Sequence, residues 1–113
     1  TIKQIKEILP IVKNSKTILS VFAGRIYDTG VDANKIMSKI CKIVHKKSKC
    51  LVLWASPRMI YDLKQAEKIN CDIITLSVDL IKKKKFFGKK LEKYSLETVK
   101  NFFIDAAKSN YKL

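Results

Sequence analysis

The sequence predicts an α/β fold with a parallel sheet, and three observations lead to this prediction. Short apolar segments that fit β-strands lie at about residues 17–23, 50–55 and 71–76. Segments with apolar residues at helical spacing lie before, between and after them. The candidate strands are almost wholly apolar, as strands buried on both faces of a sheet should be. Because strands and helices alternate, the strands should run parallel and be joined by right-handed crossovers.

Two architectures fit this pattern, a small open sandwich and an arc of a (β/α)₈ barrel. The 113 residues suffice for one domain, which we place at residues 1–113. A complete barrel takes about 250 residues, so the sequence is too short to close one. It begins at Thr1 instead of Met, which suggests a cut or processed start. No GxGxxG or P-loop motif supports dinucleotide or nucleotide binding.

The first predicted helix begins after Thr1, a favourable N-cap that Gln4 completes as a capping box. Pro10 should bend or shorten this helix. Its apolar stripe consists of Ile2, Ile5, Ile8, Leu9 and Val12.

The first strand, at about residues 17–23, should end in a polar loop that starts at Gly24 and turns at residues 28–30. Asp32 is then a suitable N-cap for a helix at about residues 33–47. The apolar side of that helix consists of Ile36, Met37, Ile40, Cys41, Ile43 and Val44.

The second strand, at residues 50–55, precedes Ser56 and Pro57, a favourable N-cap and first helical residue. A helix at about residues 57–69, burying Ile60, Leu63 and Ala66, and a third strand at residues 71–76 should follow. After these we predict a short helix at residues 78–84, a break at Gly88 and a last helix capped by Ser95.

The distribution of arginine is the clearest compositional signal. The chain has 22 lysines but only two arginines, Arg25 and Arg58, and each follows the end of a predicted strand. Ligands bind at the carboxyl ends of strands in α/β folds. The planar guanidinium also suits bidentate recognition of phosphate or carboxylate better than an ammonium does. The two arginines therefore indicate either an anion site or two structural salt bridges.

The remaining chemistry-bearing residues exclude several classes of enzyme. His45 is the only histidine and lies among lysines on the polar side of its helix, so we expect a solvated surface residue. This excludes Ser-His-Asp and Cys-His catalysis. The odd number of cysteines and the absence of a CxxC spacing favour free thiols in a reducing cytoplasm over a disulfide or metal site. These cysteines are Cys41, Cys50 and Cys71.

The net charge of +14 raises nucleic acid or an anionic membrane surface as partners. Seven of the twelve residues 82–93 are lysine, but aromatic residues rarely interrupt the lysine runs. We therefore favour a solvated lysine-rich surface over a nucleic-acid-binding face. No segment approaches the roughly 20 apolar residues that a membrane span requires. We expect no membrane partner, and the free thiols predict a cytoplasmic location.

Three segments together resemble the transaldolase family. Residues 20–26 (Ser-Val-Phe-Ala-Gly-Arg-Ile) are similar to its Ser-Pro-Phe-x-Gly-Arg-Ile strand end, and Ser56-Pro57-Arg58 to its Ser-x-Arg. Residues 71–77 look like its last strand, of the Gly-Cys-Asp-x-(Ile/Leu)-Thr type, and residues 86–91 and 111–113 like its bacterial branch. The resemblance covers the whole chain. Val21 replaces the usual Pro, and Asn70 replaces a Gly.

This resemblance implies strands six to eight of a (β/α)₈ barrel and an enzyme of carbohydrate metabolism, such as the pentose phosphate pathway. Carried over by position, Arg25, Ser56 and Arg58 would hold the substrate phosphate. Ser20 would face the sugar hydroxyls, although it could simply fill the barrel interior. Phe22 stands where the fructose-phosphate-aldolase branch carries Tyr, which favours transfer over aldol cleavage.

Members of the family use a Schiff-base lysine on strand four, carboxylates on strands one and three, and no metal or other cofactor. Those strands are absent here, so the resemblance implies a transaldolase or aldolase fragment that binds phosphate without catalysing. The alternative is a small basic α/β module that binds nucleic acid or acidic partners. Unpaired strand edges also leave a homo-oligomer open.

Overall fold

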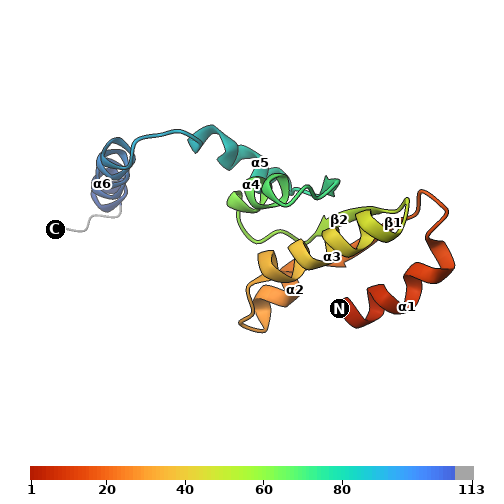
Figure 1. Ribbon diagram of the computed structural model, residues 1–113. Helices are drawn as coiled ribbons and strands as arrows, with labels where there is room; N and C mark the ends of the chain where they lie inside the picture. Colours follow the sequence, from red (N-terminus) through yellow and green to blue (C-terminus); the bar gives the residue numbers. More distant parts are fainter. Residues whose placement is uncertain (109–113) are drawn as a thin grey trace. The chain divides into compact units, whose positions relative to one another are not determined.

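The computed structural model describes residues 1–108 of the chain (Figure 1). The chain divides into two compact units, Thr1–Lys82 and Lys83–Leu113. The first unit contains a three-stranded sheet formed by β1 (Ile18–Phe22), β2 (Leu51–Ala55) and β3 (Ile73–Ile74). The single-domain boundary at residues 1–113 stays a prediction.

The sheet is parallel, and its strands lie in the order β1-β2-β3. In its register Leu19 faces Val52 and Val21 faces Trp54. These four residues are buried and lie on the face that the helices cover. The alternate residues of β1 are exposed. The mixed α/β fold with a parallel sheet is therefore confirmed, and one of its faces is open along β1.

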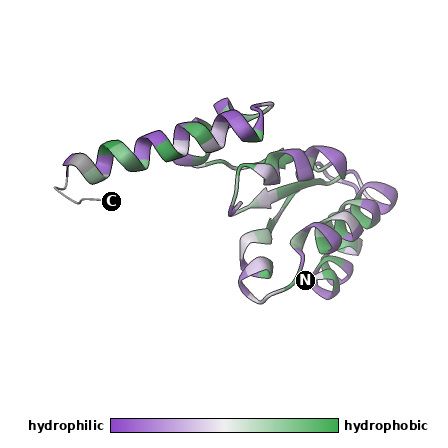
Figure 2. Cartoon of the chain, turned by 90° about the vertical axis from the view of Figure 1, so that its left-hand side faces the viewer, coloured by the Kyte–Doolittle hydropathy of each residue, from purple (hydrophilic) through white to green (hydrophobic). Residues whose placement is uncertain are grey.

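Two helices supply most of the core that packs on the covered face. Helix α1 (Ile2–Val12) begins with the predicted capping box, in which the Gln4 amide donates to Oγ1 of Thr1 at 3.1 Å. It continues for only two residues past Pro10. Helix α3 (Ala33–Lys47) begins after Asp32, whose carboxylate accepts from the Asn34 amide at 3.0 Å, as predicted. Both helices alternate hydrophilic and hydrophobic residues, as amphipathic helices do (Figure 2).

The polar loop predicted after β1 is wrong, because helix α2 (Ala23–Asp28) begins directly at the strand end. Ala23 and Gly24 are buried, so tertiary packing holds this segment in a helix despite its glycine. The turn at its end is as predicted. The Thr29 hydroxyl donates to the Ile26 carbonyl at 2.7 Å, and Gly30 takes a φ of 79° that favours glycine.

The prediction that Ser56 caps the next helix is also wrong. Ser56 has a left-handed φ of 55°, and helix α4 (Tyr61–Lys68) begins five residues later. The amides of Arg58 and Met59, in the loop between Ser56 and α4, donate to the buried carboxylate of Asp62 in the first turn of α4. A side chain downstream of the loop therefore has the role that the sequence suggested for Ser56.

Strand β3 is much shorter than the predicted segment 71–76. Cys71 lies before the strand, and its amide donates to the Ala66 carbonyl near the end of α4 at 2.9 Å. The Val52 amide of the neighbouring strand donates to the Asp72 carboxylate at 2.8 Å instead of to a backbone carbonyl. His45 is exposed, as expected, but its Nε2 lies 2.7 Å from the same carboxylate. Asp72 thus joins β2, β3 and α3.

We expect Asp72→Asn to lower the free energy of unfolding at pH 7 by about 1–2 kcal/mol, since hydrogen bonds to a charged acceptor are lost. Burial alone would raise the pKa of Asp72, but the hydrogen bonds from Val52 and His45 outweigh it and hold the pKa below the ordinary 3.8. A carboxyl with a lowered pKa stabilises the fold above its ordinary pKa and loses that effect as the pH falls. Urea unfolding from pH 7 to pH 3 should show the variant and the wild type converging.

The exposed Asp79 provides the control, because Asp79→Asn removes the same charge without a hydrogen bond in the described residues. An Asp72→Asn protein as stable as this control at pH 7 would contradict the role assigned to the carboxylate.

Three helical segments complete the described chain: α5 (Val78–Lys83), the 3₁₀ turn η1 (Lys84–Phe86) and α6 (Leu91–Lys108). Helix α6 begins four residues before Ser95, so the prediction that Ser95 caps it is wrong. The first turn is fixed by tertiary contacts, because the Tyr94 ring packs edge-on against Phe86 at 5.0 Å and Lys89 pairs with Glu97. The closing motif at residues 111–113 lies outside the described residues.

Candidate functional site

A cavity of about 870 Å³ lies along β1. Its wall includes side chains of α1, such as Ile5 and Ile8, and the residues of β1. Three of the residues predicted from the sequence, Ser20, Phe22 and Arg25, also line it. Ser20 and Phe22 are exposed on the open face of the sheet, where an apolar ring and a hydroxyl are presented together. The structure therefore brings these three residues to one cavity.

Arg25 contributes a cationic side chain to the wall of this cavity. It lies in α2, three residues after the end of β1, and its side chain is exposed. Within residues 1–108 its guanidinium forms neither a hydrogen bond nor an ion pair. Its five N–H donors are thus available to an anion.

Arg58 approaches the same helix from the loop after β2. Its Nη2 lies 2.7 Å from the Asp28 carboxylate at the end of α2. The guanidinium also lies over Gly24, because a Cβ added there would be 2.9 Å from Cζ and Nε of Arg58. Arg58 does not line the β1 cavity, but it packs against the residue that precedes Arg25.

Ser56 lies in the same loop and is half-buried. Its carbonyl oxygen would be 2.0 Å from a Cβ on Gly24, so the loop and α2 touch at this glycine. Among the described residues its hydroxyl has no hydrogen-bond partner. The loop thus presents a hydroxyl and a guanidinium beside the helix that bears Arg25.

Sequence reasoning missed the residue that holds this loop. Asp62 is fully buried and accepts hydrogen bonds from the Tyr27 hydroxyl at 3.1 Å and from Gln65 Nε2 at 2.9 Å, in addition to the two loop amides. Burial raises the pKa of Tyr27, and the Asp62 carboxylate adds to this effect, so the phenol remains a donor. The sequence did contain a signal for this role. An aspartate that follows Ser-Pro-Arg in the first turn of a helix can accept hydrogen bonds from the free amides at the start of that helix.

A comparison with family models identifies the family of the chain. The family model described as transaldolase/fructose-6-phosphate aldolase matches residues 1–113. The chain belongs to this family. A search of curated proteins found no match. Membership of this family supports, at the level of the family, an enzyme that acts on a sugar phosphate.

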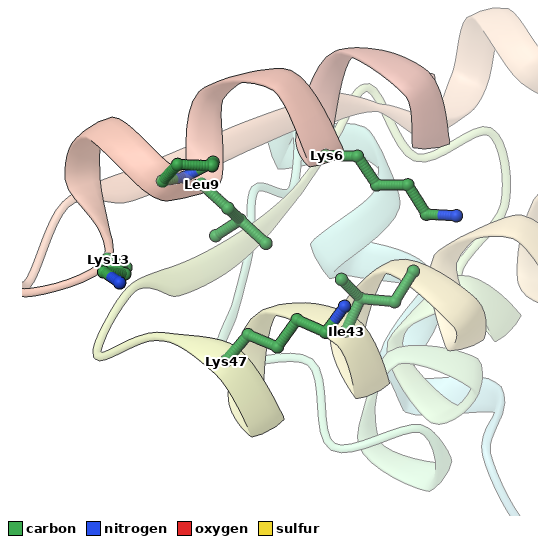
Figure 3. Close-up of a pocket in the computed structure, with 6 residues that line it drawn as sticks. Lys6, Leu9, Lys13, Ile43 and Lys47 are labelled. Carbon is green, nitrogen blue, oxygen red and sulfur yellow. The ribbon is translucent and has the colours of Figure 1, made fainter.

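A second depression, shown in Figure 3, lies apart from these family motifs. It has a volume of about 560 Å³ and lies between α1 and the end of α3. Three lysines line it, Lys6, Lys13 and Lys47, with apolar residues such as Leu9 and Ile43. None of the site residues predicted from the sequence belongs to this lysine groove.

The cysteines do not add a further site. All three are free thiols, and within residues 1–108 no group of three or more His, Cys, Asp or Glu side chains is arranged to hold a metal ion. A hydrogen bond with Cys41 lowers the pKa of Cys71 to about 7 and raises that of Cys41. In the described part of the chain, no helix is both long and apolar enough to cross a membrane.

Proposed function

We propose that this chain is the phosphate-binding part of a transaldolase or aldolase barrel and corresponds to strands six to eight. The observation that carries the proposal is the unpaired Arg25 in a cavity with Ser20 and Phe22, beside a loop that presents Ser56 and Arg58. Membership of the family over the whole chain supports it. In this proposal Arg25, Ser56 and Arg58 bind the phosphate. Ser20 and Phe22 contact the sugar.

The pairing of Arg58 with Asp28 is compatible with phosphate binding. Both side chains are about half exposed, and an exposed ion pair contributes only about 0–1 kcal/mol. A phosphate accepts charge-assisted hydrogen bonds from a guanidinium with bidentate geometry. Arg58 can therefore exchange or share its contact with Asp28 at little cost when a phosphate binds.

We expect Arg25→Ala to weaken the binding of fructose 6-phosphate at least about tenfold, because a hydrogen bond to a charged group contributes about 1.5–3 kcal/mol. Isothermal titration of the 113-residue chain measures the affinity, and inorganic phosphate should compete. Lys46→Ala removes one exposed positive charge from α3 and is the matched control. Equal affinities of the Arg25→Ala and Lys46→Ala proteins would refute the proposed role of Arg25.

The isolated chain should bind without catalysing. A Schiff base needs a lysine with a lowered pKa in a dry pocket, and none of the lysines lies in β1, β2 or β3. Treatment with fructose 6-phosphate and borohydride should therefore leave the mass of the protein unchanged. A trapped sugar adduct on any lysine would show that the chain carries its own nucleophile.

A second candidate function is binding of acidic partners, and the lysine groove favours it. No carboxylate of residues 1–108 lines the groove, and apolar residues such as Leu9 and Ile43 line it together with its three lysines. Under this alternative, affinity for nucleic acid should fall steeply with salt, because binding releases counterions. That affinity should also be insensitive to Arg25→Ala, which separates the two functions.

A further inference from the structure

A buried carboxylate without a cationic partner is the feature that the proposed function leaves unexplained. Asp62 has no solvent exposure, and in the described chain no lysine, arginine or histidine pairs with it. Burying a charge is costly unless hydrogen bonds satisfy it. Four donors do so here, two on each oxygen.

The two oxygens serve different parts of the site. Oδ2 accepts from the backbone amides of Arg58 at 2.8 Å and Met59 at 3.2 Å. Oδ1 accepts from Tyr27, which lies in α2 two residues after Arg25. One carboxylate therefore connects the loop that carries Arg58 to the helix that carries Arg25.

Gln65 holds the other oxygen of the carboxylate, Oδ1, in place. Gln65 Nε2 donates to Oδ1 of Asp62 at 2.9 Å and to the Tyr27 hydroxyl at 2.9 Å. Its Oε1 accepts from the side-chain amide of Asn34 in α3 at 2.8 Å. The carboxylate is thus held by α2, α3 and α4 and has little freedom to follow a displaced loop.

We propose that Asp62 is a positioning residue for the anion site and sets the place of the Arg58 backbone relative to Arg25. The proposal rests on the function proposed above, since it assigns the network a role in binding phosphate. Asp62 itself touches no substrate. Its effect reaches the anion through Arg58, and it should disappear when the Arg58 side chain is removed.

The test is a double-mutant cycle on fructose 6-phosphate affinity. Asp62→Asn replaces one acceptor oxygen by a donor, so two of the four hydrogen bonds are lost. We expect its affinity to fall about tenfold, to the level of Arg58→Ala. The double variant should bind no more weakly than Arg58→Ala alone, because both changes remove the same interaction. Asp79→Asn, with the same loss of charge at an exposed position, should bind like the wild type.

Amide hydrogen exchange gives a readout that does not depend on phosphate. Asp62→Asn should speed exchange at the Arg58 and Met59 amides, while amides of α3 keep their protection. Should Asp62→Asn fail to fold, Tyr27→Phe takes its place, because it removes one donor to Oδ1 and leaves the loop contacts in place. It should cause a smaller loss of affinity that also vanishes in the Arg58→Ala background.

The possible outcomes separate this inference from the proposed function. If Arg58→Ala binds like the wild type, the phosphate role of Arg58 fails, while the exchange rates still decide whether Asp62 fixes the loop. If Asp62→Asn keeps both wild-type affinity and wild-type exchange at Arg58, the positioning role is overturned. Additive losses in the double variant would overturn it too, since they would indicate a general loss of stability.

Discussion

Replacing Trp54 by alanine is expected to lower the free energy of unfolding by about 3–5 kcal/mol, the range measured for truncating a buried large aromatic residue. Trp54 is fully buried on the covered face of β2, where its ring packs in the core with residues of β1 and α3. Removing the ring leaves a cavity that the surrounding side chains fill only partly. Trp54 is the only tryptophan of the chain, so the alanine variant has no tryptophan fluorescence. Urea unfolding is therefore followed by circular dichroism.

Trp54→Phe is the matched control for this prediction. The indole Nε1 is buried and has no hydrogen-bond partner in the described residues, so its loss relieves an unsatisfied donor. We therefore expect Trp54→Phe to cost much less than Trp54→Ala. A loss as large as that of the alanine variant would mean that the indole N–H is satisfied, for instance by a water molecule.

Local signals in the sequence predicted the parts of the fold that depend on local interactions. The capping box of Thr1 and Gln4 and the N-cap at Asp32 are confirmed, because each requires only residues within one turn of a helix. The apolar segments correctly predicted three parallel strands. Their alternation with amphipathic helices leaves few other ways to bury them.

The errors occur where distant residues decide the local structure. Gly24 reads as the start of a loop, but it is buried in α2, where it packs closely against the Ser56 carbonyl. Ser56 reads as an N-cap, but it has a left-handed φ of 55°, and the carboxylate of Asp62 accepts from the loop amides of Arg58 and Met59. Ser95 likewise reads as a cap, but the packing of Tyr94 against Phe86 draws the preceding turn into α6.

The candidate site shows the same division. Alternation along β1 places Ser20 and Phe22 on one face, and the cavity beside that face includes Arg25. The direction of the Arg58 side chain depends on the path of a loop, and it lies on α2, paired with Asp28, outside the wall of that cavity. The convergence of both guanidinium groups on one anion therefore stays a prediction, and the binding experiments with fructose 6-phosphate test it.

Gly24→Ala should destabilise the protein by about 1–3 kcal/mol, the usual cost of overpacking a filled core, and should also weaken phosphate binding. The new methyl group would lie 2.0 Å from the Ser56 carbonyl oxygen and 2.9 Å from the Arg58 guanidinium. A backbone atom cannot rotate away as a flexible side chain can, so the loop itself must shift and carry Arg58 with it. Urea unfolding followed by Trp54 fluorescence and titration with fructose 6-phosphate measure the two effects.

Gly30 separates this steric effect from the general cost of changing a glycine. A Cβ on Gly30 meets no atom within 4 Å, but the φ of 79° disfavours most other residues. Gly30→Asn should be tolerated, because asparagine adopts left-handed conformations more readily than most residues, and it should leave phosphate affinity unchanged. A Gly24→Ala protein that matches Gly30→Asn in both stability and affinity would mean that the loop is free to move off α2. The close contact would then contribute nothing to the position of Arg58, which would depend on the hydrogen bonds of Asp62 to the loop.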